Sequence, residues 1–164
     1  MKASEKLYAL TKQEEGVRLK AYRCAANKLT IGYGHTSNVR PGQTITIDEA
    51  VNMLNDDVAS VEMDLNGYFK IKSVILKQGQ FDAIVDFCFN VGFPKFRGST
   101  LCKVIVNNPN DPNVFAQFKR WVYADGSHNG KDDDGDGIVD EPGEMQVLDD
   151  LAKRRQHEIN LYLG

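Results

Sequence analysis

The sequence has 164 residues, of which 41% are hydrophobic and 26% are charged, a composition typical of one globular domain that excludes a disordered or fibrous chain. No apolar run approaches the roughly 20 residues that a membrane-spanning helix needs. The net charge of −3 is too small to select a target by itself, and three cysteines are too few, and odd in number, for a disulfide framework.

The start of the chain is predicted to form one helix followed by a small antiparallel sheet. The helix should span about 4–13, with Gly16 as its stop signal. Apolar and polar residues then alternate over 17–22 and over 29–34, which is typical of strands with one buried and one solvated face. A third short strand is expected at about 43–45.

The rest of the chain is predicted to be mainly helical. Thr46 and Glu49 have the spacing of a capping box and should open a long helix, because apolar residues follow at helical spacing. The segment 125–144 has no periodicity and is predicted to be a loop. Further helices are expected at about 76–90, 100–107 and 112–123, and from Met145 to Leu163.

These elements predict a single α+β domain over residues 1–164. A β lobe should occupy about 14–46 and a mainly helical lobe 47–164, with a cleft between the two lobes. The acidic segment 125–144 is an insertion in the helical lobe.

Three side chains near the predicted strands are candidates for chemistry: Glu15, Cys24 and Thr30. Glu15 lies at the C-terminal end of the first helix, where the helix dipole disfavours a carboxylate and favours the protonated form that a general acid needs. Cys24 ends the first strand, and Thr30 should lie on the polar face of the second. A carboxyl, a thiol and a hydroxyl group can therefore converge at the mouth of the cleft. A glutamate before a helix-ending glycine is, however, often only solvated.

The same segment resembles the phage-type lysozyme (endolysin) family, glycoside hydrolase family 24. The pattern of that family is a glutamate, eight residues, an aspartate or cysteine, five residues and a threonine. Glu15, Cys24 and Thr30 have this spacing. Further segments that match the text of the family follow in order along nearly the whole chain, at 30–36, 89–92, 98–101, 120–124 and 154–163.

The resemblance implies a lysozyme-like fold and hydrolysis of the β-1,4 bond between N-acetylmuramic acid and N-acetylglucosamine in peptidoglycan. It implies that Glu15 protonates the leaving oxygen, while the positions of Cys24 and Thr30 handle the attacking water on the opposite face. The implied stereochemistry is inverting, which places acid and base roughly 6.5–9.5 Å apart. We expect peptidoglycan glycan strands as partner, no nucleic acid, no membrane and a monomeric enzyme.

Cys24 leaves several hypotheses open, because an aspartate at this position would be ionised whereas the ordinary pKa of a cysteine lies above neutrality. Cys24 is a thiolate stabilised by Arg23 or Lys28, or a neutral thiol beside a water held by Thr30. Alternatively, the chain has lost activity and only binds the cell wall. A lytic transglycosylase on a related fold is a further alternative, since it needs no base for water. The last alternative function, independent of Cys24, is a calcium-dependent interaction protein.

The last helix offers a partner for Glu15. Arg154 and Arg155 are adjacent there, and either can pair with the carboxylate, but the sequence does not distinguish them. Such a pair would favour the ionised form of Glu15 and oppose the effect of the helix dipole.

The acidic segment 125–144 is absent from the pattern of the family. It contains eight acidic side chains and one lysine, so the rest of the chain is mildly cationic, which suits a polyanionic target. Its spacing resembles a calcium loop of the EF-hand type, although Gly143 occupies the position of the last glutamate ligand. Glu144, one residue later, is the candidate for this last ligand, and Glu141 is the alternative. The predicted ligands are Asp132, Asp134, Asp136, the Ile138 carbonyl, Asp140 and Glu144.

Calcium would have a structural role here, and no cofactor is expected for catalysis. A plain acidic loop is the alternative. Because no apolar signal segment follows Met1, we expect synthesis in the cytoplasm. The enzyme would then reach the cell wall by holin-dependent release, within a phage tail or through a secretion system.

Overall fold

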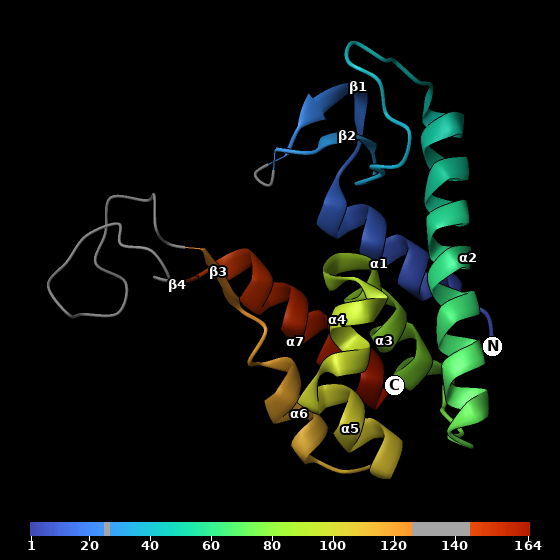
Figure 1. Cartoon of the computed structure of the whole chain (residues 1–164), viewed down its shortest axis with the longest axis vertical. Helices are drawn as coiled ribbons and strands as arrows, with labels where there is room; N and C mark the ends of the chain where they lie inside the picture. The colour runs from blue at the N-terminus through green and yellow to red at the C-terminus, as the bar shows by residue number, and fades with distance from the viewer. Residues whose placement is uncertain (25–26, 126–144) are drawn as a thin grey trace, which may run out of the picture.

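A computed structural model describes residues 1–24, 27–125 and 145–164, with the α+β order that the sequence predicts (Figure 1). The strands are β1 (Arg18–Arg23), β2 (Leu29–Gly32), β3 (Tyr123–Asp125) and β4 (Met145–Val147). The helices are α1 (Glu5–Glu15), α2 (Ile47–Ile71), α3 (Gln78–Val91), α4 (Phe93–Gly98), α5 (Thr100–Asn107), α6 (Asn113–Phe118) and α7 (Asp149–Leu163).

Strands β1 and β2 form an antiparallel hairpin beyond the end of α1, at the top of the view in Figure 1. Tyr22 is opposite Thr30 in the register, and the pairing is irregular between Arg18 and Tyr22. The predicted third strand is present only as an isolated bridge between Lys20 and Thr44.

The prediction of one wet face on each strand is wrong. Leu19 in β1 is 38% exposed, whereas Thr30 in β2 is only 3% exposed, beside fully buried Ile31. The reason is the position of the hairpin: β2 packs against α2, whereas β1 lies between β2 and the segment at 43–45, to which its backbone is hydrogen-bonded. Packing against α2 buries β2, while most side chains of β1 stay in contact with solvent.

Helix α2 begins at the predicted capping box. The Thr46 hydroxyl accepts a hydrogen bond from the Glu49 N–H at 3.2 Å, and the Glu49 carboxylate accepts one from the Thr46 N–H at 2.7 Å. These bonds stabilise the charged carboxylate and lower the pKa of Glu49.

Helix α3 is the centre of the hydrophobic core. It packs against α7, α2, α4 and α1, and most of its residues are buried (Figure 1). Two aspartates, Asp82 and Asp86, lie one turn apart in the mainly apolar middle of this helix and are also buried. A buried carboxylate needs compensating partners, so these two residues indicate specific contacts with neighbouring helices.

The C-terminal part differs from the prediction in two places. The helix predicted at 112–123 ends at Phe118, and the last helix begins at Asp149 rather than Met145. The chain instead forms β3 and β4, which pair antiparallel with Tyr123 opposite Val147. This pairing satisfies backbone groups that the predicted helices would have used. Of the loop predicted at 125–144, Asp125 belongs to β3 instead, and residues 126–144 lie outside the described residues.

Candidate active site

Glu15 is the last residue of α1, as predicted. Gly16 follows with φ of +61°, a conformation that favours glycine, and its N–H donates to the Lys12 carbonyl at 3.2 Å. The Glu15 side chain is 22% exposed, so it is largely desolvated but still accessible. The chain then enters β1 within three residues, which places the carboxyl group at the junction between helix and hairpin.

The turn after β2 lies directly against the Glu15 carboxylate. A Cβ atom at Gly34 would be 3.3 Å from Oε2 of Glu15 and 4.0 Å from the ring of Phe89. Gly34 also has φ of +89°, so both the backbone and the space favour glycine. The next residue, His35, is fixed to α2 by its Nδ1, which lies 2.8 Å from Asp57.

Arg154, not Arg155, is the partner of Glu15. Its Nη1 donates a hydrogen bond to Oε1 of Glu15 at 2.5 Å. Its Nε and Nη2 donate to the two carboxylate oxygens of Asp86 at 3.0 and 3.2 Å. Asp86 also accepts a hydrogen bond from the Thr11 hydroxyl at 3.0 Å. One guanidinium group from α7 therefore joins α1 and α3.

The charge of Arg154 is maintained by these carboxylates. Burial lowers the pKa of Arg154, but the nearby charges of Asp86 and Glu15 outweigh burial and the net pKa is raised. Arg154 is therefore a constant cation and a constant hydrogen-bond donor to Glu15.

Arg155 contacts a second group of buried side chains, next to the contacts of Arg154 between α7 and α3. Its Nη2 donates to Glu158 at 2.6 Å and to the Asn90 side chain at 3.0 Å, and its guanidinium lies 4.9 Å from the ring centre of Phe87. Burial is the main cause that raises the pKa of Glu158 well above its ordinary value. Burial also lowers the pKa of Arg155.

The hairpin turn brings Cys24 and Thr30 together. The carbonyl of Lys28 accepts hydrogen bonds from the Cys24 N–H at 3.0 Å and from the Thr30 hydroxyl at 3.1 Å. Arg23, one of the two residues proposed to stabilise a thiolate, donates through Nη1 to the Asn27 carbonyl at 2.8 Å. Thr30 and Cys24 are thus neighbours on the hairpin, while Glu15 is held by Arg154 and borders the Gly34 turn.

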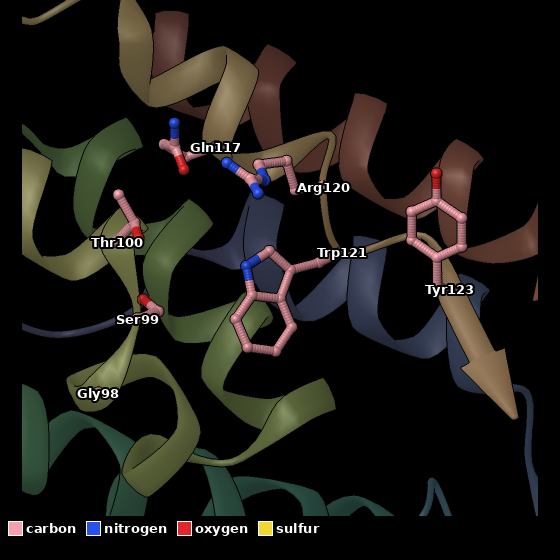
Figure 2. Close-up of a pocket in the computed structure, with 7 residues that line it drawn as sticks. All are labelled: Gly98, Ser99, Thr100, Gln117, Arg120, Trp121 and Tyr123. Atoms are coloured by element: carbon pink, nitrogen blue, oxygen red, sulfur yellow. The ribbon is translucent and has the colours of Figure 1, made fainter. Parts of the chain in front are cut away.

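A cavity of about 710 Å³ opens near the start of α5 (Figure 2). Ser99 and Thr100 lie on one side of it, across from Arg120 and Trp121. The Trp121 ring also packs edge-on against Phe87 at 5.1 Å between ring centres. The full lining is Gly98, Ser99, Thr100, Gln117, Arg120, Trp121 and Tyr123.

Sequence reasoning missed Asp86 and Gly34 as members of this site. A signal for Asp86 was available, because an aspartate inside the apolar run 81–89 has to find a buried partner. The predicted calcium ligands, Asp132, Asp134, Asp136, Ile138, Asp140 and Glu144, lie outside the described residues. Within 1–24, 27–125 and 145–164, no helix is long and apolar enough to cross a membrane.

Comparison with known sequences identifies relatives of the whole chain. The family model of phage lysozyme matches residues 12–158. An endolysin of Acyrthosiphon pisum secondary endosymbiont phage 1 is 39% identical over 162 residues, which is 99% of this chain and 98% of the relative. An endolysin of Bacillus phage PZA is 40% identical over 129 residues, 77% of this chain but only about half (48%) of the relative. A SAR-endolysin of bacteriophage PS119 is 38% identical over 113 residues, 68% of this chain and 65% of the relative.

Comparison with solved structures identifies proteins with a similar fold over nearly the whole chain. The muramidase domain of SpmX from Asticaccaulis excentricus has a TM-score of 0.81 at 29% identity, over 99% of this chain and 98% of that one. A mutant of the P22 lysozyme has a TM-score of 0.72 at 30% identity, over 100% of this chain and 99% of that one. The similarity therefore covers both the hairpin and the helical body.

Proposed function

Because the chain belongs to the phage lysozyme family of peptidoglycan-degrading glycoside hydrolases, we propose that Glu15 is the general acid that cleaves the β-1,4 bond between N-acetylmuramic acid and N-acetylglucosamine. The observation that carries this proposal is the environment of the Glu15 carboxyl group. It is largely desolvated, still accessible, and bound to Arg154 on one oxygen only.

The two oxygens of Glu15 have different roles in this proposal. Oε1 accepts the hydrogen bond from Nη1 of Arg154. Oε2 borders the Gly34 turn, and among the described residues no cation is paired with it, so the transferable proton is assigned to this oxygen. The proton passes from Oε2 to the glycosidic oxygen as the bond to the anomeric carbon breaks, and this leaves Glu15 as a carboxylate paired with Arg154.

The water is proposed to attack from the side of the hairpin. The Thr30 hydroxyl donates a hydrogen bond to the Lys28 carbonyl. The hydroxyl oxygen of Thr30 can therefore still accept a hydrogen bond and orient a water molecule. Cys24, its neighbour, either accepts the proton of that water as a thiolate or stays neutral while solvent accepts it. Attack opposite to the leaving group inverts the anomeric carbon.

The decisive experiment is mass spectrometry of the products released from purified peptidoglycan. We expect muropeptides with ordinary reducing ends from the wild type and none from Glu15→Gln. Glu14→Gln is the matched control, because Glu14 is the neighbouring carboxylate and binds His157 at 2.5 Å instead of an arginine. The control should retain activity.

Two other results would each contradict the proposal. Anhydro-muramic ends would identify a lytic transglycosylase. Failure of a folded wild type to release any product would leave wall binding as the function, and a pull-down with peptidoglycan would then test it.

We further propose that the acidic segment binds calcium, with a structural role and none in bond cleavage. The sequence carries this proposal, and the fold adds one supporting observation. Strands β3 and β4 flank the segment and pair with Asp125 opposite Met145, so the two ends of the segment are adjacent. Calcium would stabilise a closed loop between these strands.

The route to the substrate is also a proposal. We propose that the enzyme is made in the cytoplasm and acts on the cell wall as a monomer after release through a membrane opened by another protein. A relative named as a SAR-endolysin indicates that export differs among related phages. Fractionation of expressing cells with and without a holin tests the route, and sedimentation tests the monomer.

A further inference from the structure

We propose that Asp86 is a positioning residue for the catalytic acid. It acts through Arg154, and the assignment rests on the proposed role of Glu15. The first observation is that Asp86 is completely buried in the middle of α3, where a carboxylate is costly without partners. Its partners are Arg154, through both carboxylate oxygens, Thr11, and the Glu158 carboxyl group of α7.

The contacts form a closed ring through three helices. Thr11 and Glu15 lie one turn apart on α1, Asp86 is on α3 and Arg154 is on α7. Thr11 donates to Asp86, Asp86 accepts the Nε and Nη2 protons of Arg154, and the remaining Nη1 donates to Glu15. Because two of its nitrogens are fixed by Asp86, the guanidinium has one orientation left in which to meet the acid.

Asp86 also changes the charge that Glu15 experiences. An unopposed guanidinium at this distance would hold Glu15 in its ionised form, which cannot protonate a leaving group. The carboxylate of Asp86 neutralises part of that charge, so the field of Arg154 at Glu15 is weaker than that of an isolated guanidinium. Arg154 then acts mainly as an oriented hydrogen-bond donor.

The other charged groups around this ring are few. From α7, Glu158 has a carboxylate oxygen 3.9 Å from Nε of Arg154, and Arg155 binds Glu158 at 2.6 Å. From α1, Glu14 is paired with His157. Among the described residues, Glu158 is the group placed to compensate for the loss of Asp86, by becoming ionised next to Arg154.

The test is the pH profile of kcat/KM on uncrosslinked peptidoglycan strands for Asp86→Asn. The alkaline limb should move to lower pH by about one unit or more, because the full charge of Arg154 then favours ionised Glu15. Asp86→Asn should shift the alkaline limb further in the Glu158→Gln background than in the wild type, because Glu158 can then no longer compensate. The double variant is therefore compared with Glu158→Gln. An alkaline limb unchanged in both backgrounds would overturn the proposal.

Thr11→Val and Asp82→Asn separate orientation and charge from stability. Thr11→Val removes the hydroxyl group that donates to Asp86. We expect kcat to fall about tenfold, while KM and the position of the alkaline limb of the pH profile stay unchanged. If Asp86→Asn fails to fold, Thr11→Val tests the proposal in its place. An unchanged kcat in Thr11→Val would then contradict the proposal. Asp82 is buried one turn earlier in α3 and binds the Ser4 hydroxyl at 2.5 Å, without an arginine. Asp82→Asn should lower Tm but leave the pH profile unchanged.

Failure of the proposed function would look different. If Glu15→Gln retained activity, Glu15 would not be the acid, whatever Asp86 does. If Glu15→Gln were inactive while the Asp86 and Thr11 variants matched the wild type, only the role of Asp86 would be wrong.

Discussion

Nη1 of Arg154 lies 2.5 Å from Oε1 of Glu15, although the two residues are 139 positions apart in the sequence. This contact joins the first and the last helix at the point where the chain turns into the hairpin. The proposed acid is thereby fixed by the helical body rather than by the hairpin, whose own residues Cys24 and Thr30 donate hydrogen bonds to the Lys28 carbonyl. Glu15 and the pair Cys24 and Thr30 therefore belong to separately supported elements.

Gly34→Ala should lower activity because the added methyl group would meet Oε2 of Glu15 at 3.3 Å. The positive φ of Gly34 adds backbone strain of about 1 kcal/mol or more to the loss of stability. Gly42→Ala is the matched control, since Gly42 has φ of +75° but nothing within 4 Å of its added Cβ. Both variants should lose similar stability in denaturant titrations, and only Gly34→Ala should lose kcat. Equal activity of the two variants would show that the space beside Oε2 is not needed.

The state of Cys24 can be determined from the dependence of the rate on pH. If Cys24 works as a thiolate, kcat should rise with pH through the titration of the thiol, and Cys24→Ser should lose this rise. If Cys24 is a neutral thiol, the profile of Cys24→Ser should have the same shape as that of the wild type. Cys24→Asp places an ionised group at this position and should be active at neutral pH in either case. A Cys24→Asp variant that folds but is inactive would argue against a base at this position.

Several parts of this site could be predicted from the sequence and others could not. Glu15 was placed correctly because a following glycine marks a helix end locally. The choice between Arg154 and Arg155 was open because adjacent residues on a helix point about 100° apart, and only the packing of α7 against α3 fixes which one faces Glu15.

The burial of Thr30 was missed for a similar reason. Alternating residues predict which side chains share a face of the strand, but not which elements pack against the strand. Helix α2 packs against β2, and Thr30 is buried there. The strands β3 and β4 were missed because three residues are too few to show a period. Local signals thus predicted most of the helices and the place of Glu15 at a helix end, while contacts between distant helices determined the partners of Glu15.

Glu158→Gln should make stability less sensitive to pH. Burial raises the pKa of Glu158 well above its value in the unfolded chain, so the folded protein binds a proton there that the unfolded chain releases. The stabilisation from this proton is therefore fully present below the unfolded pKa and is lost as pH rises through the folded pKa. Denaturant titrations from pH 4 to 8 should show a smaller decrease for Glu158→Gln than for the wild type. Parallel curves would mean that Glu158 is ionised in the folded protein, as the partner of Arg155.

Calcium should raise the melting temperature without being required for bond cleavage. At a free concentration about a hundred times Kd, a ligand that binds only the folded state contributes about 2.7 kcal/mol, which is measurable by thermal unfolding. Asp132→Asn/Asp134→Asn removes two of the predicted ligands and should abolish the calcium-dependent shift while leaving the activity on peptidoglycan unchanged. Magnesium at the same concentration is the control for a general effect of divalent ions on this acidic segment. If a chelator abolished activity while the circular dichroism of the fold stayed intact, calcium would belong to the reaction rather than to the loop.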